Sequence, residues 1–229
     1  MSSSITWLGH AAFRFDTTAG HRFYVDPFLT GNPSCPAAEV EPDRVDAILV
    51  THGHGDHVGD TVRLARAFAC PVIAQVELRG LLGAEIGDEV TQSINKGGGV
   101  DVLGSHVTLT HANHSSSYAD TYAGESCGLV IETPGDPTLY FAGDTNVFGD
   151  MALIGRIYAP DVAILPIGDH YTMGPREAAV AAELVGARRV LPSHYGTFPL
   201  LTGTPAALRG LLPPGIELIV PRPGETVPL

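Results

Sequence analysis

Residues 48–60, ILVTHGHGDHVGD, begin as an apolar strand and continue as a polar loop spaced by glycines. Of the ten histidines in the chain, three fall within six positions of this loop together with an aspartate, as His52, His54, Asp56 and His57. Imidazole and carboxylate groups are good ligands for a divalent cation. Gly53 and Gly55 let the backbone turn tightly enough for alternate side chains to converge. The stretch therefore predicts a metal site at the end of a strand rather than a solvated loop.

The composition of the whole chain is that of a folded protein. Its 229 residues can bury one sizeable core, and 44% hydrophobic with 17% charged residues argues against disorder. The net charge of −12 argues against a broad surface for long nucleic acid or anionic membrane, although a short oligonucleotide stays compatible with it. A small anionic substrate is also compatible, because a buried metal cluster can reverse the local field.

The three cysteines lie far apart and in no zinc-ribbon spacing, at Cys35, Cys70 and Cys127. This pattern predicts no disulfide framework and favours a reducing, cytoplasmic location. The opening MSSSITWLGH has no signal-peptide pattern, and no apolar run reaches membrane-spanning length. We therefore expect a cytoplasmic protein without a membrane partner; a homo-oligomer is compatible with the sequence.

Short apolar strands alternate with helices along the chain. Residues 5–17 and 21–28 predict a hairpin, and 45–52 predict a strand buried on both faces. Helices are expected over 60–69, with Asp60 as N-cap, and over 76–83, closed by glycine.

The second half of the chain repeats the pattern. Its clearest helix begins at Pro175 and ends at Gly186, and its last strand is expected over 216–221. Hairpins combined with strand–helix units predict two mixed sheets covered by helices. We expect one domain over residues 1–229, an α/β sandwich of four layers.

Side chains able to do chemistry follow the ends of the predicted strands, at Asp26, His52, His114, Asp144, His170 and His194. Loops at one edge of an α/β sheet are where ligands and catalytic groups usually gather. Their common placement predicts that these residues meet in space.

The HGHGDH motif resembles the H-x-H-x-D-H signature of the metallo-β-lactamase superfamily, and a later histidine, GDT and a histidine on a late strand continue that series. More narrowly, DPFLTGNP, HSS, FAGDT, LPIGDHYTMGP and HYGTFP resemble the UPF0173 metal-dependent hydrolases, akin to lactonases of the UlaG type. The resemblance covers nearly the whole chain from Trp7. It implies the four-layer αββα sandwich of the metallo-β-lactamase type.

The resemblance also implies two divalent metals. One would be held by His52, His54 and His114, the other by Asp56, His57 and His194, with Asp144 bridging them. Zinc or manganese suits this set of nitrogen and oxygen donors, and iron is compatible with it.

The segment THANHSSS offers a second histidine, His111. The family motif selects His114, and strand alternation would turn His111 to the opposite face. His111 nevertheless stays open as the alternative ligand, whereas His106 is expected at a turn or on the surface.

Other candidates have two interpretations each. Asp26 orients a ligand histidine or closes a turn, and His10 faces the site or is a structural histidine. His170 donates a proton to a leaving group or binds a substrate anion. Tyr195 steadies an oxyanion or packs. Residues 115–117, three serines, suggest loop hydrogen bonds rather than a nucleophile.

These assignments predict a hydrolase in which Asp56 or Asp144 orients a metal-activated hydroxide. Two dications, two aspartates and one hydroxide sum to about +1, which favours an anionic ester such as a phosphodiester or a lactone. The alternative is a non-hydrolytic metalloprotein, either redox or metal-sensing. The related flavodiiron proteins have an acidic residue where this chain has His54, which argues against the redox alternative.

Overall fold

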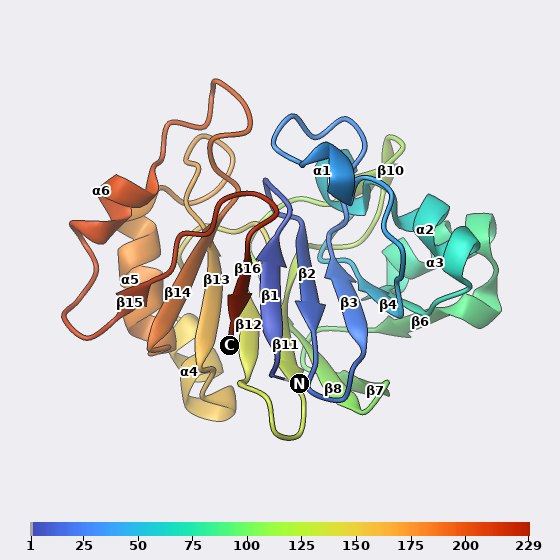
Figure 1. The fold of residues 1–229 in the computed structure, drawn as a ribbon, viewed down its shortest axis with the longest axis horizontal. Coiled ribbons are helices and arrows are strands. Elements are labelled where there is room, and N and C mark those ends of the chain that lie inside the picture. Colours follow the sequence, from blue (N-terminus) through green and yellow to red (C-terminus); the bar gives the residue numbers. More distant parts are fainter. Residues whose placement is uncertain (1) are drawn as a thin grey trace.

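The computed structural model describes residues 2–229. Two seven-stranded mixed sheets lie face to face, and helices cover their outer sides (Figure 1). The four-layer αββα arrangement predicted from the sequence is therefore present.

The first sheet combines an antiparallel and a parallel part. Pairing is antiparallel from β16 to β3 and parallel from β3 to β6. Its strands, in spatial order, are β16 (Thr226–Pro228), β1 (Ser4–Trp7), β2 (Phe13–Asp16), β3 (Arg22–Val25), β4 (Ala47–Leu49), β5 (Val72–Gln75) and β6 (Thr91–Ile94).

The second sheet has the same plan, with parallel pairing from β15 to β12 and antiparallel pairing from β12 to β7. Its strands, in spatial order, are β15 (Glu217–Leu218), β14 (Arg189–Ser193), β13 (Val162–Pro166), β12 (Leu139–Phe141), β11 (Cys127–Glu132), β8 (Ser105–His111) and β7 (Gly99–Val102). A separate two-stranded ribbon joins β9 (Ser117–Tyr118) and β10 (Thr121–Tyr122).

The helices fall into two groups, one for each sheet. The group beside the first sheet contains α1 (Gly55–Val58), α2 (Thr61–Phe68) and α3 (Val76–Ile86). The group beside the second contains α4 (Met151–Tyr158), α5 (Pro175–Val185) and α6 (Pro205–Arg209). Two 3₁₀ turns are η1 (Ala37–Glu39) and η2 (Asp88–Val90). No helix of residues 2–229 combines the length and apolarity needed to cross a membrane.

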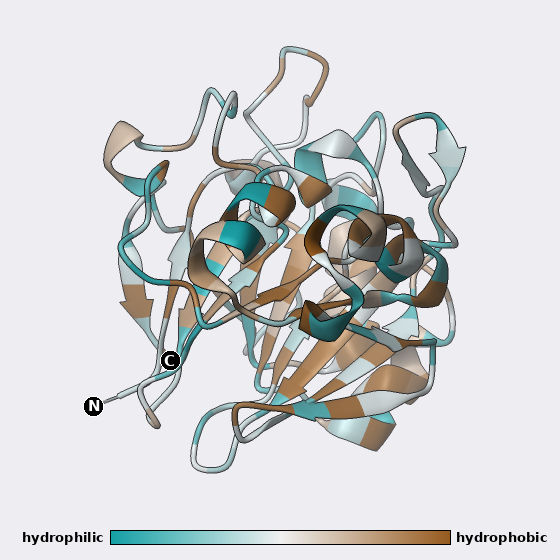
Figure 2. Cartoon of the chain, turned by 90° about the vertical axis from the view of Figure 1, so that its right-hand side faces the viewer, coloured by the Kyte–Doolittle hydropathy of each residue, from teal (hydrophilic) through white to brown (hydrophobic). Residues whose placement is uncertain are grey.

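The core has three parts because each sheet buries both of its faces. Phe13, Phe15, Leu129 and Phe141 belong to the cluster between the sheets. One outer cluster packs α2 and α3 on the first sheet, and the other packs α4 and α5 on the second. Strands β4, β5 and β13 are buried at every position. The continuous apolar run of 45–52 predicted this for β4. Figure 2 shows hydrophobic residues concentrated on the strands.

Several boundaries differ from those predicted. Residues 5–17 form two strands, β1 and β2, because the chain reverses at Gly9 and His10, which have φ values of 95° and 55°. Helix α3 continues past Gly83 to Ile86. Strand β16 follows the segment expected to be last, and β6 was not predicted, because its sequence TQSI lacks an apolar pattern. Helix α5 begins at Pro175 and is followed by Gly186, as predicted.

The topology brings the ligand-bearing loops to one edge. Strands β3 and β4 are parallel in the first sheet, as are β12, β13 and β14 in the second. The carboxyl ends of parallel strands meet at a common edge. Two backbone hydrogen bonds join the sheets there, from His194 N to His10 O at 2.9 Å and from Cys127 N to Thr51 O at 3.2 Å.

Candidate metal centre

The histidine loop follows β4 and carries its ligands on a single helical turn. His54 is the N-cap of α1, whose four residues include Asp56 and His57. A Cβ at Gly53 would lie 2.8 Å from Ala123 Cβ and 2.9 Å from Ser117 O, so a side chain does not fit there. Gly53 is thus needed for close packing against the 117–123 segment as well as for the turn.

His52, His54 and His114 form one group of candidate ligand atoms. The Nε2 atom of His52 lies 3.0 Å from Nδ1 of His54. The Thr51 hydroxyl donates to Asp26 Oδ2 at 2.7 Å, so it accepts from His52 Nδ1 at 3.0 Å. Burial holds the pKa of His52 well below its usual range, which keeps the ring neutral. A neutral ring protonated at Nδ1 presents the lone pair of Nε2 to a cation.

Asp144 lies at the centre of the cluster. Its Oδ2 atom is 3.3 Å from Nε2 of both His57 and His194, 3.8 Å from Nε2 of His114 and 4.0 Å from Nε2 of His52. One buried carboxylate oxygen among four ring nitrogens has the arrangement of a bridge between two cations.

Four buried atoms of the cluster have no hydrogen-bond partner among residues 2–229: His57 Nε2, Asp144 Oδ1 and the Nδ1 atoms of His10 and His194. Leaving a buried polar atom without a partner costs about 1–3 kcal/mol, more for a charged group. Orphaned donor atoms beside further imidazole and carboxylate groups therefore fit a pair of divalent metals.

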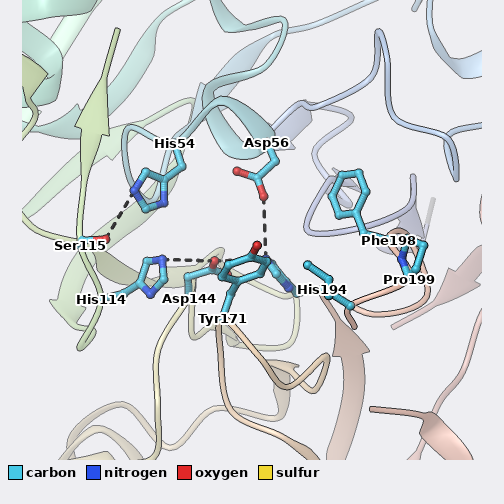
Figure 3. Close-up of a pocket in the computed structure, with 10 residues that line it drawn as sticks. His54, Asp56, His114, Ser115, Asp144, Tyr171, His194, Phe198 and Pro199 are labelled. Atoms are coloured by element: carbon cyan, nitrogen blue, oxygen red, sulfur yellow. Dashed lines mark hydrogen bonds and ion pairs between the residues drawn. The ribbon is translucent and has the colours of Figure 1, made fainter. Parts of the chain in front are cut away.

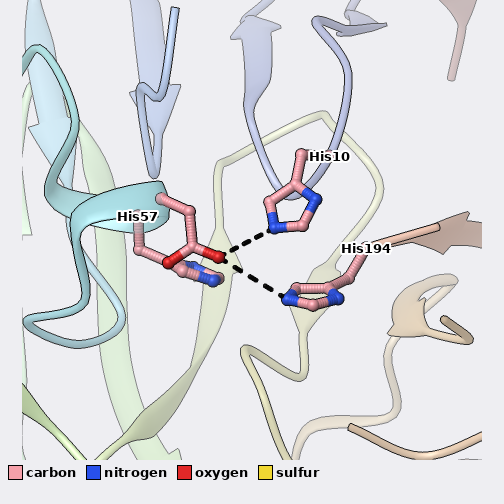
Figure 4. A group of neighbouring side chains, drawn as sticks. His10, His57 and His194 are labelled. Atoms are coloured by element: carbon pink, nitrogen blue, oxygen red, sulfur yellow. Dashed lines mark hydrogen bonds and ion pairs between the residues drawn. The ribbon is translucent and has the colours of Figure 1, made fainter. Parts of the chain in front are cut away.

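The second group joins Asp56, His57 and His194 with His10. Asp56 Oδ2 is 3.0 Å from His10 Nε2 and 3.9 Å from His194 Nε2, and Figure 4 shows both contacts. The His10 and His194 rings lie 4.0 Å apart between centroids. His10 is completely buried. Of the two interpretations of His10, the structure favours the one that places it at the site.

Asp26 holds the ligand loop from behind. It accepts hydrogen bonds from Thr51 N at 2.8 Å and from the Thr51 hydroxyl at 2.7 Å, and its Oδ2 lies 2.7 Å from His57 Nδ1. The contact with His57 Nδ1 leaves Nε2 facing Asp144. This geometry is that of a carboxylate orienting a ligand histidine.

The buried charges in the cluster shift one another. Burial opposes protonation of His57, but the carboxylates of Asp144 and Asp26 outweigh it and raise the His57 pKa well above its usual range. Burial alone would raise the pKa of Asp144, but His57 and His194 hold it well below the usual value. Burial lowers the pKa of His10 to about 4, against the opposing effect of Asp56. The cluster thus places His57, whose protonated form is stabilised, next to histidines and carboxylates whose deprotonated forms are stabilised.

Three residues at the site have a left-handed backbone. His10, Asp26 and His194 have φ values of 55°, 46° and 53°, a region that residues with a Cβ rarely adopt. Such strain persists where the surrounding structure overdetermines it, often at functional sites.

A cavity of about 590 Å³ opens over this cluster of histidines and aspartates (Figure 3). Its lining combines ligand residues, one serine and an apolar group: His54, Asp56, His114, Ser115, Asp144, Tyr171, His194, Phe198, Pro199 and Leu200. Phe198 and Pro199 lie across the cavity from His54 and His114 (Figure 3). The site is therefore open to a small molecule from solvent.

Comparison with known proteins identifies the family of this chain. The model of the beta-lactamase superfamily domain matches residues 21–195. A UPF0173 metal-dependent hydrolase from Herpetosiphon aurantiacus is 50% identical over 218 residues, which cover 92% of this chain and 90% of that protein. The chain belongs to the UPF0173 family. A second member, from Koribacter versatilis, is 44% identical over 97% of this chain and 96% of its own length.

Solved structures confirm the metallo-β-lactamase fold of this UPF0173 chain. Igni18, a metallo hydrolase from Ignicoccus hospitalis KIN4/I, superposes with a TM-score of 0.88 at 32% identity, covering 100% of this chain and 99% of its own. YhfI from Bacillus subtilis, a metallo-beta-lactamase fold protein, has a TM-score of 0.72 at 18% identity and covers 99% of this chain and 100% of its own. At that identity the second likeness concerns the fold alone.

His170 and Tyr195, both predicted site residues of the UPF0173 chain, lie outside the cavity lining and outside the groups of candidate ligands. His170 is exposed and packs edge-on against Tyr171, with ring centroids 4.4 Å apart, so Tyr171 is the residue of that loop which reaches the cavity. Tyr195 stacks on Trp7 with centroids 4.8 Å apart, and burial raises its pKa to about 12. This placement favours packing for Tyr195, and the catalytic role of His170 stays a prediction without a contact to the cluster.

The remaining polar candidates also have defined places. His111 is exposed, with Nδ1 3.4 Å from Lys96 Nζ, and does not join the ligand groups. His106 pairs with Asp101 at the surface. Ser115 lies 3.5 Å from His54 Nε2, whereas Ser116 is buried and accepts from Gly53 N at 3.0 Å. Loop hydrogen bonds were the predicted role of these serines.

Sequence reasoning missed the apolar lining at Tyr171, Phe198, Pro199 and Leu200. A signal existed in FPLL, an apolar run that follows His194 without strand alternation. Exposed apolar residues next to a ligand could have indicated a substrate surface.

Proposed function

We propose that this UPF0173 chain is a hydrolase of anionic esters, with phosphodiesters or lactones as substrates, that uses two divalent metals. The observation that carries the proposal is the position of Asp144, whose Oδ2 lies within 4.0 Å of Nε2 of four histidines from three separate segments. A mononuclear or purely structural site has no need of a buried bridging carboxylate below an open cavity.

In this proposal His52, His54 and His114 would hold one metal, and Asp56, His57 and His194 would hold the other. Asp144 would be shared between them, which is the division that the family resemblance implies. Zinc, manganese or iron held there would supply an acidified water and a positive field for a developing oxyanion.

Asp56 is the carboxylate best placed to act on the substrate side. It lines the cavity, and its Oδ2 is fixed by His10 at 3.0 Å. Burial opposes ionisation of Asp56, but His10 and His57 lower its pKa below the usual range, so it stays an acceptor at neutral pH. Asp56 would orient an attacking water. Asp144, which is more deeply buried, would contribute negative charge that balances the two metals.

The preference for an anion rests on charge. The cavity lining, taken over residues 2–229, contains no lysine or arginine. Two dications, two carboxylates and one hydroxide leave about +1 in the site, so an anionic or strongly polarised ester is favoured. The overall charge of −12 disfavours long polyanions at the surrounding surface.

Hydrolysis rates of zinc- and manganese-loaded protein on four substrates test the proposal: a phosphodiester, a phosphomonoester, a lactone and a β-lactam. We expect metal-dependent turnover of the phosphodiester or the lactone, and at least a hundredfold lower kcat in Asp144→Asn with a loosened metal. Undiminished turnover in that variant with two metals bound contradicts the site assignment. Absence of hydrolysis across the panel, with two metals bound, overturns the hydrolase proposal in favour of redox or metal sensing.

A further inference from the structure

The apolar side chains of the cavity form one surface, which we call the apolar wall: Tyr171, Phe198 and Leu200. Their exposed fractions are 55%, 38% and 52%, and they are three of the ten large hydrophobic residues exposed among residues 2–229. All three line the one cavity that also holds the metal ligands. Exposed apolar residues gathered at a polar site point to a bound apolar group.

The segment that carries Phe198 and Leu200 is fastened at both ends. It begins at His194 and ends at Gly203, whose N donates to Gly168 O at 3.1 Å. A Cβ at Gly203 would lie 1.7 Å from Ile167 O, so backbone meets backbone there. Between these ends, Leu201 is buried and its N donates to Phe198 O at 3.0 Å. The wall is thus preformed at this end.

The segment that carries Tyr171 is held in a similar way. Met173 is completely buried, and its N donates to Thr145 O at 3.0 Å, next to the bridging Asp144. Asp169 N donates to Met173 O at 3.2 Å, which closes the loop around Tyr171. Two anchored loops therefore present apolar side chains beside the metal cluster.

We propose that the apolar wall binds a single alkyl or aryl substituent of the substrate, so that the substrate is a small amphiphile with an anionic ester head. This inference rests on the proposed function for the identity of the head. The cavity is large enough for such a substrate, because its volume of about 590 Å³ lies within the range of roughly 300–1,000 Å³ typical of small-molecule sites. Polar residues, among them His54 and Ser115, occupy the opposite side of the cavity (Figure 3) and would face the head.

Binding of n-alkyl phosphonates, from methyl to octyl, to the metal-loaded protein tests the wall without turnover. Each methylene that becomes buried should tighten binding about fourfold, the equivalent of about 0.8 kcal/mol per CH₂. The phosphonate group is the same throughout the series, so the gain with chain length reports the wall alone. Isothermal titration calorimetry gives the dissociation constants.

The variants Phe198→Ala, Leu200→Ala and the double variant should flatten the dependence on chain length while methyl phosphonate binds as before. Leu153→Ala is the matched control, since Leu153 is a 42% exposed leucine outside the cavity lining, on α4. Metal content and melting temperature verify that each variant is folded and loaded.

The two proposals fail in different ways. Binding that does not depend on chain length, an unchanged dependence in the double variant, or no binding at any length overturns the apolar wall. Chain-length-dependent binding without hydrolysis of any ester supports the wall and overturns the hydrolase.

Discussion

Asp26 offers the sharpest test of how the ligand loop is held. Its carboxylate faces three donors, Thr51 N, the Thr51 hydroxyl and His57 Nδ1, at 2.7–2.8 Å. In Asp26→Asn, Oδ1 can still accept from Thr51 N, but the amide NH₂ takes the place of Oδ2. The amide is a donor, so it cannot accept the Nδ1–H that His57 must keep when its Nε2 binds a metal.

Asp26→Asn removes two hydrogen bonds to Oδ2, from His57 Nδ1 and from the Thr51 hydroxyl. The one from His57, to a charged acceptor, is worth about 1.5–3 kcal/mol. Loss of a partner that orients a metal ligand typically reduces metal affinity about 10–100-fold, or about 1.4–2.8 kcal/mol, and the two magnitudes agree. We therefore expect Asp26→Asn to weaken the metal bound by His57 about 10–100-fold and to affect the metal bound by His54 much less.

The assay is competition for zinc between the protein and a chromogenic chelator, resolved into two binding steps. Asp161→Asn is the matched control, because Asp161 Oδ2 accepts from a backbone N–H, that of Thr138, at 2.9 Å on an exposed part of the chain. Equal affinities of Asp26→Asn and the unmodified protein at both steps would refute the orienting role. Equal weakening of both steps would show that Asp26 supports the loop as a whole.

Three further predictions concern histidines. His10→Ala should weaken the metal shared by Asp56 and His194 about tenfold, and His10→Gln, which can still donate to Asp56, should recover most of it; metal titration decides, and equal losses in both contradict a positioning role. His170→Ala should leave metal content unchanged, and any loss of metal in that variant would make His170 a ligand. The pKa of His57 is raised in the folded protein, so protonation of His57 stabilises the metal-free protein. This contribution is complete below about pH 6.5 and is lost as the pH rises toward and through the folded pKa. Between about pH 7 and 8 the free energy of unfolding of metal-free protein should therefore fall as the pH rises, by at most about 1.4 kcal/mol per pH unit. The buried histidines with lowered pKa values act in the opposite sense only below about pH 6.5, so a flat profile from urea unfolding over that window contradicts the assignment.

The local sequence was enough to predict the ligand loop and the helices and strands that have a clear apolar pattern. The HGHGDH spacing predicted which residues of 52–57 converge, and the apolar run of 45–52 predicted the buried strand β4. The edge strand β16 was not predicted, because its three residues form a strand only by pairing with β1, at the other end of the chain. A contact of that range leaves no periodic signal in a short segment.

The sequence by itself determined the donor chemistry of this protein: which histidines and aspartates follow strand ends, and hence nitrogen and oxygen ligands for divalent metals. Only the tertiary structure decided how close Asp144 lies to the histidines, that His10 contacts Asp56, and that Phe198 rather than Tyr195 lines the cavity. Ligand type is a property of each side chain. Distances between loops depend on how two sheets pack, and on backbone bonds such as that from His194 N to His10 O, which join segments far apart in the chain.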